Sequence, residues 1–268
     1  MAQVVKTGSG VKNLSVGNTV VSSVPFGTWG EMVVTNADHV NKVEDPSTAL
    51  ALGPTSCTAL RILSDFGSLK EGDWIVQNAA NGAVGQAVIQ IAKARGLKTI
   101  NVIRGAAENG AIDSLKSLGG DIVVPESYFM STEYKRLVEN LPAPKLGING
   151  VGGDSVTNVA RSLGQGAHLV TYGSVSRNAV TIPTSALVNK NLSLSGFSYA
   201  TWAAETSSAQ REGMIKELSD LVQSKKLTME ASDKFKFADF QKALDKALEG
   251  HYSNASSDYY EEKVVVTL

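Results

Sequence analysis

The sequence predicts an α/β protein whose main domain is built on a doubly wound parallel sheet. From Asp73 onward, short apolar segments end in glycine-containing turns and alternate with segments whose apolar residues have helical spacing. Strands that alternate with helices form parallel sheets covered by helices on both faces. The 25 glycines among the 268 residues agree with this fold, because tight strand–helix turns need glycine.

The alternation begins with a strand at Trp74–Gln77 and a helix that starts near Ala83 and stops at Gly96. The helix has one apolar face that would pack on the sheet, formed by Val84, Ala87, Val88, Ile91 and Ala92. Further strands are expected at Thr99–Ile103, Asp121–Val124, Lys145–Asn149, Ala167–Tyr172 and Leu192–Phe197. The helices that separate them are expected near Ala111–Leu118, Thr132–Asn140 and Ser155–Leu163.

Both flanks of this alternation have different patterns. The stretch up to Ala49 is β-like, with strands expected at Asn18–Val24 and Glu31–Thr35, and a helix that ends at Gly67 follows it. After Phe197 the expected elements are helices at Gln210–Gln223 and Ala238–Glu249 and a strand at Lys263–Leu268.

The composition argues against several classes of function. The net charge is -1 and no long basic block occurs, so nucleic acid is not expected as the main partner. No apolar run approaches bilayer length, so no membrane insertion is expected. Cys57 is the single cysteine, and His39, His168 and His251 lack ligand spacing. We therefore expect neither an intrachain disulfide nor a bound metal.

A six-residue turn, Ala80-Asn81-Gly82-Ala83-Val84-Gly85, lies between the first strand and the first helix of the alternation. It is a variant of G-x-G-x-x-G with Ala80 at the first glycine position. In such motifs small residues let the backbone approach a pyrophosphate, and the helix N-terminus offers N–H groups. The alternative is a small-residue turn needed only for packing. Its place in a strand–turn–helix–strand unit favours dinucleotide binding on a Rossmann-type domain.

Arg104 ends the second strand, nineteen residues after Gly85. Enzymes that use NAD usually carry an acidic residue in this region, whereas an arginine can pair with the 2′-phosphate of NADP. A solvated arginine at a strand end is the alternative. Because the glycine turn precedes it, Arg104 favours NADPH as the cofactor.

Two later loops also follow strand ends, namely Asn149-Gly150-Val151-Gly152-Gly153 and Tyr172-Gly173-Ser174. Ligands of open α/β sheets lie outside the carboxyl ends of the strands, although either loop alone could equally serve only to turn the chain. No Ser/His/Asp triad or carboxylate pair stands out. Hydride transfer can proceed without one, since the nicotinamide carries the chemistry. The catalytic residues stay unassigned.

The stretch Gln77–Ala92 and the strand Thr99–Arg104 resemble the mitochondrial trans-2-enoyl-CoA, or enoyl-acyl-carrier-protein, reductase family of the zinc-free medium-chain dehydrogenase/reductase superfamily. The likeness extends from Gly27-Thr28-Trp29 through Cys57-Thr58-Ala59 to Lys263. It implies NADPH-dependent reduction of a trans-2-enoyl thioester, carried on CoA or on acyl carrier protein, in mitochondrial fatty-acid synthesis. Hydride would reach the β-carbon and a proton the α-carbon.

The resemblance also assigns cofactor residues by position. Gly82, Ala83, Val84 and Gly85 would lie against the pyrophosphate, and Arg104 would bind the 2′-phosphate. The residues implied around the rest of the cofactor are Thr55, Thr58, Tyr172, Gly173, Ser174, Val175, Phe197 and Lys263.

Several positions depart from the family pattern. Gly105 and Ala106 follow Arg104 where the family continues with aspartate and arginine, and the lost anchor would weaken NADPH binding by ~1–3 kcal/mol. Thr55-Ser56 replaces an asparagine–proline pair, and Ser198 replaces a tryptophan. The family's N-terminal stretch with its catalytic tyrosine is missing from this chain, and none of the seven tyrosines here occupies its motif.

These departures leave two rival functions open. One is an NADPH-binding regulatory or dimerising protein derived from the reductase, which would bind the cofactor without turnover. The other is a quinone or alkenal reductase of the same superfamily, which would act on free quinones and be indifferent to the thioester.

The resemblance implies a domain plan, an assembly and a location. Residues 1–50 and 229–268 would form part of a GroES-like catalytic domain, incomplete relative to the family, and residues 51–228 the Rossmann-type NADPH-binding domain. A homodimer through the cofactor domains is implied. The family is mitochondrial, whereas Met1–Val20 shows no import signal, so a cytoplasmic location is left open for this form.

Overall fold

A computed structural model describes residues 1–24, 30–104, 110–229, 233–252 and 264–267. The Gly27-Thr28-Trp29 motif and Lys263 lie outside the described residues. The chain forms two compact units, one of Met1–Thr58, Ser198–Leu248 and Glu262–Leu268, the other of Ala59–Phe197 and Glu249–Glu261. The domain plan of 1–50 with 229–268 and of 51–228 stays a prediction. The units differ from it in grouping Ser198–Gln223 with the N-terminal segment.

The second unit contains a six-stranded sheet in which every pair of neighbouring strands is parallel. Its strands are β4 (Trp74–Gln77), β5 (Lys98–Ile103), β6 (Ile122–Pro125), β7 (Leu146–Asn149), β8 (His168–Thr171) and β9 (Ser193–Gly196). The order is β6-β5-β4-β7-β8-β9, so the chain moves outward in one direction from β4 and in the other from β7. This is the strand order of a doubly wound dinucleotide-binding fold, as the sequence predicted.

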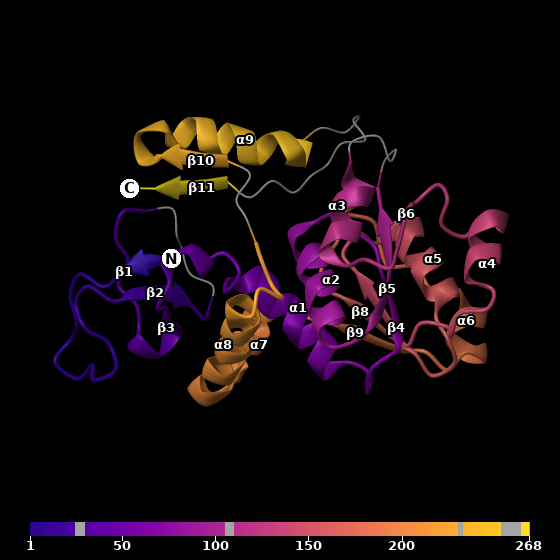
Figure 1. Cartoon of the computed structure of the whole chain (residues 1–268), viewed down its shortest axis with the longest axis horizontal. Helices are drawn as coiled ribbons and strands as arrows, with labels where there is room; N and C mark the ends of the chain where they lie inside the picture. Colours follow the sequence, from indigo (N-terminus) through magenta and orange to yellow (C-terminus); the bar gives the residue numbers. More distant parts are fainter. Residues whose placement is uncertain (25–29, 105–109, 230–232, 253–263, 268) are drawn as a thin grey trace. The chain divides into compact units, whose positions relative to one another are not determined.

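Helices cover both faces of this sheet (Figure 1). They are α2 (Ala83–Ala94), α3 (Ala111–Leu118), α4 (Thr132–Val138), α5 (Gly153–Ser162) and α6 (Thr184–Asn189). Figure 1 shows α2 and α3 on one side and α4 and α5 on the other. Side chains alternate along β5, so Ile103 packs with Ile89 and Leu115 on one face while Val102 packs with the α5 side chains on the other.

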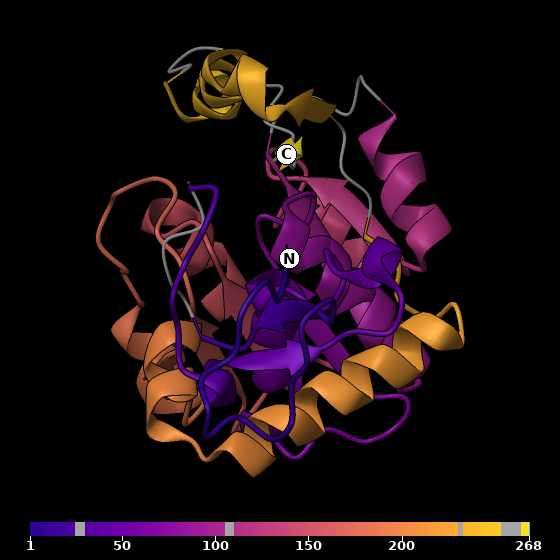
Figure 2. The same ribbon diagram turned by 90° about the vertical axis from the view of Figure 1, so that its left-hand side faces the viewer.

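The first unit combines short strands and helices. An antiparallel sheet of order β1-β2-β3 contains Ala2–Gln3, Thr19–Ser22 and Val40–Lys42, and β10 (Asp233–Lys236) pairs in parallel with β11 (Val264–Thr267). Its helices are α7 (Tyr199–Glu205) and α8 (Ser208–Gln223), the long helix that is plain in Figure 2. Two further helices, α1 (Pro54–Asp65) and α9 (Phe240–Tyr252), belong in part to each unit. The small antiparallel sheet is consistent with the GroES-like part of the predicted fold.

The expected strand at Glu31–Thr35 is wrong, because these residues form no strand and Val34 is 100% exposed. β-Branched residues favour strands only where a neighbouring strand pairs with them. The helix expected at Ala238–Glu249 is observed as α9, which runs from Phe240 to Tyr252.

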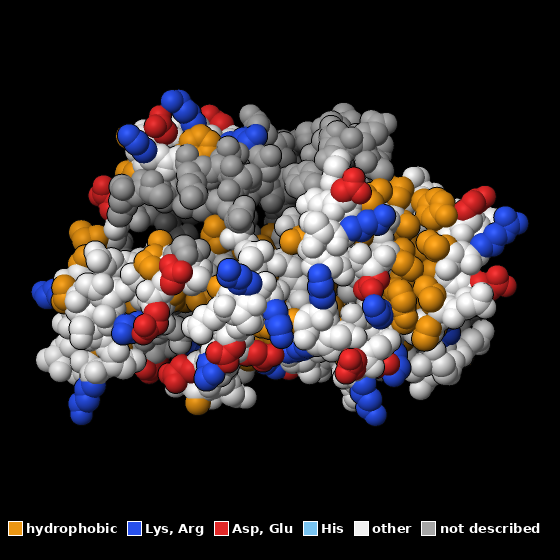
Figure 3. Space-filling model, in the orientation of Figure 1, with side chains coloured by type: hydrophobic (Ala, Val, Ile, Leu, Met, Phe, Trp, Pro, Cys, Tyr) orange, Lys and Arg blue, Asp and Glu red, His pale blue; other side chains and the backbone are white. Residues whose placement is uncertain are grey.

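Surface charge is mixed on the face drawn in Figure 3, where acidic and basic side chains are intermingled. Within the described part of the chain, none of the helices combines the length and apolar character needed to cross a membrane.

Candidate cofactor site

The turn between β4 and α2 has the geometry of a nucleotide-binding turn. Ala79 adopts a left-handed conformation (φ 50°), and the N–H of Gly82 donates to the Ala79 carbonyl at 3.0 Å. Gly82 is the N-cap of α2, and no side chain caps the helix there. A helix N-terminus presents backbone N–H groups and the positive end of the helix dipole, and both favour an anion.

Gly85 allows α2 to pack closely on this turn. A Cβ atom at Gly85 would lie 2.5 Å from the Ala80 carbonyl oxygen and 2.7 Å from that of Ala79. No side chain fits in that space, because both atoms belong to the backbone. The Gln77 side chain at the end of β4 donates to the Gly85 carbonyl at 3.0 Å, which joins the strand to the first turn of the helix.

The turn lies where the strand order reverses, between β4 and its neighbour β7. Open α/β sheets bind ligands at such a switch point, outside the carboxyl ends of the strands. The Asn149–Gly153 loop follows β7, and the Tyr172–Val175 segment follows β8 at the same edge of the sheet. The structure therefore brings three of the predicted motifs to one edge.

The two later loops are bonded to each other. Tyr172 N–H donates to the Asn149 carbonyl at 3.0 Å, and Val175 N–H donates to the Gly150 carbonyl at 3.0 Å. A Cβ atom at Gly150 would lie 2.7 Å from the Tyr172 hydroxyl oxygen, so only glycine leaves room for the phenol ring. Of the predicted residues here, Tyr172 and Gly173 are half-buried, whereas Ser174 and Val175 are exposed.

Arg104 directly follows β5, at the same carboxyl edge as the turn, and is exposed. The following residues 105–109, which include Gly105 and Ala106, lie outside the described residues.

Phe197 follows β9, and its backbone N–H donates to the Thr171 carbonyl at 2.9 Å. Its ring meets the Phe66 ring edge-on, with centroids 5.9 Å apart. Beside β8 and β9 an open cleft of about 300 Å³ is lined by Leu169, Thr171, Val180, Leu194, Ser195 and Gly196. None of the predicted cofactor residues lines this cleft.

Thr55 and Thr58 lie in the part of α1 that belongs to the first unit. Thr58 is 9% exposed, and its hydroxyl donates to the Pro54 carbonyl at 2.8 Å. The other predicted residues that the structure describes belong to the second unit. The role of both threonines stays a prediction.

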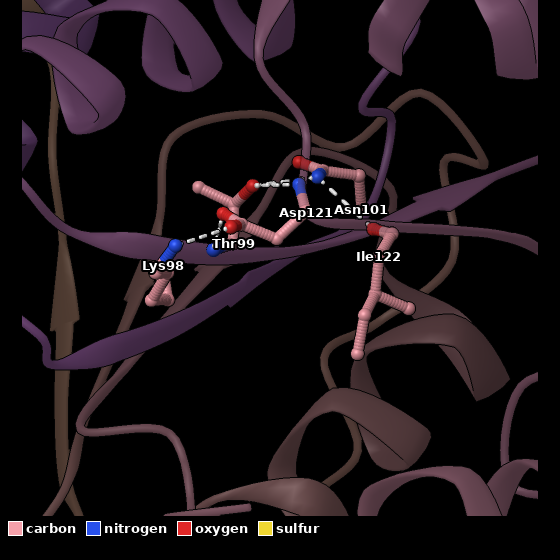
Figure 4. Close-up of polar contacts among 5 residues, drawn as sticks. All are labelled: Lys98, Thr99, Asn101, Asp121 and Ile122. Atoms are coloured by element: carbon pink, nitrogen blue, oxygen red, sulfur yellow. Dashed lines mark hydrogen bonds and ion pairs between the residues drawn. The ribbon is translucent and has the colours of Figure 1, made fainter.

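The sequence analysis did not predict hydrogen-bonding roles for four buried amide side chains, those of Gln77, Asn78, Asn101 and Asn149. Gln77 donates from Nε2 to Asn101 Oδ1 at 2.8 Å, and Asn101 donates to the Thr99 hydroxyl and the Ile122 carbonyl (Figure 4). The signal was present in the sequence, because amides inside strands buried on both faces are uncommon unless they are hydrogen-bonded.

The described residues outside the turn offer few reactive groups. Among them, no cluster of three or more His, Cys, Asp or Glu side chains could hold a metal ion. Cys57 is 0% exposed, and burial raises the pKa of its thiol to about 12, so the thiolate needed for nucleophilic attack does not form near neutral pH. Burial also raises the pKa of Tyr199 well above its usual range, and its hydroxyl donates to the Ser23 carbonyl at 2.8 Å.

Comparison with known proteins gives a consistent result. Residues 83–223 match the family model described as zinc-binding dehydrogenase. The chain is 41% identical to the mitochondrial enoyl-[acyl-carrier-protein] reductase of Dictyostelium discoideum over 255 residues, which cover 92% of this chain and 72% of that protein.

Two solved structures are also similar over 92% of this chain and 76% of theirs. The mitochondrial 2-enoyl thioester reductase Etr1p/Etr2p heterodimer from Candida tropicalis has a TM-score of 0.84 at 26% identity. The Etr1p complex with NADP and crotonyl-CoA has a TM-score of 0.83 at 27% identity.

Proposed function

Because this chain belongs to the family of mitochondrial enoyl-[acyl-carrier-protein] reductases, we propose that it reduces trans-2-enoyl thioesters with NADPH. The substrate is an enoyl group carried on CoA or on acyl carrier protein. The pathway is fatty-acid synthesis and the location is the mitochondrion, as in the family. The observation that carries the proposal is the uncapped turn between β4 and α2 at the switch point of the sheet.

The residues present fit a dinucleotide. No side chain caps α2 at Gly82, so the helix N-terminus suits a pyrophosphate, and Gly85 lets the helix approach the strand. Gly82, Ala83, Val84 and Gly85 would hold the pyrophosphate, and Arg104 would pair with the 2′-phosphate. NADPH, when bound, would supply the hydride for the β-carbon of the 2,3-double bond, and a proton added at the α-carbon would complete the reduction.

The protein's own contribution is binding and orientation. Tyr172, Gly173, Ser174 and Val175 follow β8 at the carboxyl edge, where they would flank the rest of the cofactor. Phe197 adds an apolar surface at the end of β9. No residue is assigned as proton donor.

The proposal is tested by the loss of NADPH absorbance with trans-2-hexenoyl-CoA, with NADPH affinity measured in parallel by fluorescence. Oxidation that depends on the enoyl thioester is the expected result. Tight NADPH binding without oxidation would point to the regulatory or dimerising protein, and oxidation by free quinones alone would point to a quinone reductase. If this chain bound no NADPH, the proposed function would be wrong.

We also propose that two copies of this chain associate through strand β9. In the described structure no strand pairs with the outer edge of β9, which is the last strand of its sheet. Exposed apolar side chains lie on and near it, with Leu194 46% and Val180 45% exposed. Unpaired edges flanked by apolar residues favour pairing with another chain. The related Etr1p/Etr2p structure is a heterodimer, which supports association of two such chains.

A further inference from the structure

Two buried asparagines meet at the switch point of the sheet. Asn78 follows β4 and is 1% exposed, and Asn149 ends β7 and is 0% exposed. Asn78 Nδ2 donates to Asn149 Oδ1 at 2.8 Å and to the Ser155 hydroxyl in the first turn of α5 at 3.0 Å. The residue after Asn78 is Ala79, where the nucleotide-binding turn begins.

The side chains of Asn78 and Asn149 accept hydrogen bonds from N–H groups of the Asn149–Gly153 loop, called the glycine loop below. Gly150 N–H donates to Asn78 Oδ1 at 2.8 Å. Val151 and Gly152 donate to Asn149 Oδ1 at 3.1 and 3.0 Å. Loops that bind anions do so with free, converging N–H groups. Since three successive N–H groups are already paired inside the protein, this glycine loop does not form a second phosphate site. Its role is to support the neighbouring segments.

The carbonyl groups of the same loop are bonded to the segment after β8. Besides the Tyr172 and Val175 contacts, Ser176 donates from its N–H and its hydroxyl to the Val151 carbonyl, at 3.1 and 2.6 Å. Asn149 Nδ2 also donates to the Thr171 hydroxyl at 3.1 Å. The bonds run without a break from Asn78 through the glycine loop to residues 172–176.

We propose that Asn78 is a positioning residue, whose carboxamide fixes the 149–153 and 172–176 loops in position relative to the nucleotide-binding turn. The inference rests on the proposed function, because the fixed loops would align the nicotinamide half of NADPH with the half held by the turn. Losing such alignment lowers the rate, even at some distance from the reacting atoms, by up to about 100-fold.

The first test is hydrogen exchange on the full chain, which needs neither cofactor nor substrate. In Asn78→Ala, amides in 149–153 and 172–176 should exchange at least about tenfold faster, while β5 and β6 stay protected. Thr99→Val is the matched control. Thr99 is 1% exposed in the same sheet, but its hydroxyl bonds to Asn101 and to the Asp121 N–H (Figure 4), so its loss should loosen β5 and β6 instead.

The second test separates positioning from a general loss of stability. Asn78→Ala should bind 2′-phospho-ADP-ribose, which lacks the nicotinamide, within about twofold of the native protein, while kcat falls by about 10–100-fold. Equal loss of affinity for the fragment and for NADPH would overturn the proposal, as would unchanged exchange in both loops. If Asn78→Ala does not fold, Ser155→Ala removes one acceptor only and should accelerate exchange in 149–153.

Failure of the proposed function has a different signature. In that case the native protein itself fails to bind NADPH or to reduce the thioester, whatever Asn78 does. The exchange pattern of the two loops would still show whether Asn78 holds them.

Discussion

Gly85, in the nucleotide-binding turn, has no room for a side chain. Two backbone carbonyl groups lie where its Cβ atom would be. Steric crowding of this kind cannot be relieved by rotating a side chain, so the backbone itself must move. A single methyl group at this position would therefore disturb both the packing of α2 and the cofactor site.

We predict that Gly85→Ala lowers the free energy of unfolding by about 1–3 kcal/mol and weakens NADPH binding. Urea unfolding and fluorescence titration measure the two effects. Gly213→Ala is the control, because a Cβ atom at Gly213 in α8 meets nothing within 4 Å. That variant should gain about 0.5–1 kcal/mol and bind NADPH normally. Equal behaviour of the two variants would contradict the close packing at Gly85.

Arg104 is the residue that would distinguish NADPH from NADH. We predict that Arg104→Gln weakens NADPH binding by ~1–3 kcal/mol, which corresponds to about 5–150-fold in Kd, because one charge-assisted contact to the 2′-phosphate is lost. NADH lacks this phosphate, so its affinity should not change. Arg136→Gln, an exposed arginine in the last turn of α4, is the control. A parallel fall in the affinities for both cofactors would show that Arg104 does not read the 2′-phosphate.

At the scale of single elements, α8 begins with a capping box. The Ser207 hydroxyl accepts from the Gln210 N–H at 3.3 Å, and Gln210 Oε1 accepts from the Ser207 N–H at 3.1 Å. These bonds satisfy backbone donors that the helix cannot pair internally. The box explains why the helix starts two residues earlier than the predicted Gln210.

We predict that Ser207→Ala lowers the free energy of unfolding by about 1 kcal/mol, since the cap is lost. Ser208→Ala, one residue further along, is the matched control, and its effect should lie within about 0.5 kcal/mol of zero. Urea unfolding monitored by circular dichroism measures both variants. If Ser208→Ala destabilised the protein as much as Ser207→Ala, the capping interpretation would be wrong.

The elements of the parallel sheet were largely predictable, and those around it less so. The bounds of β4 and α3 agree with the sequence analysis, because alternation, glycine stops and helical periodicity are local signals. The short helices α6 and α7 were not predicted. With six and seven residues they are too short to show a periodic apolar face. Strand β10 was also missed, because a strand pairs with residues far along the chain, here with β11.

At the scale of the whole molecule, the proposed β9 interface predicts a dimer in solution. Leu194→Lys should shift the protein toward monomers in light scattering, because a charged side chain would be buried at the interface. Leu137→Lys is the matched control. Leu137 is similarly exposed, at 50%, but it belongs to helix α4 and is far from β9 in the sequence. The proposed interface would be refuted if the native protein were monomeric, or if Leu137→Lys dissociated the dimer and Leu194→Lys did not.

The α/β class, the turn at Ala80–Gly85, the position of Arg104 after its strand and the resemblance to the reductase family could all be predicted from the amino-acid sequence. All of these depend on residues close together in the chain, where spacing reports local geometry. The hydrogen bond between Asn78 and Asn149 could not be predicted in this way, because the two residues are 71 positions apart and meet only through the strand order of the sheet. The same holds for the glycine loop after β7, whose sequence suits a turn or an anion site equally well. The N–H groups of Gly150, Val151 and Gly152 are paired with those two asparagines, so the loop supports the neighbouring segments and does not bind an anion.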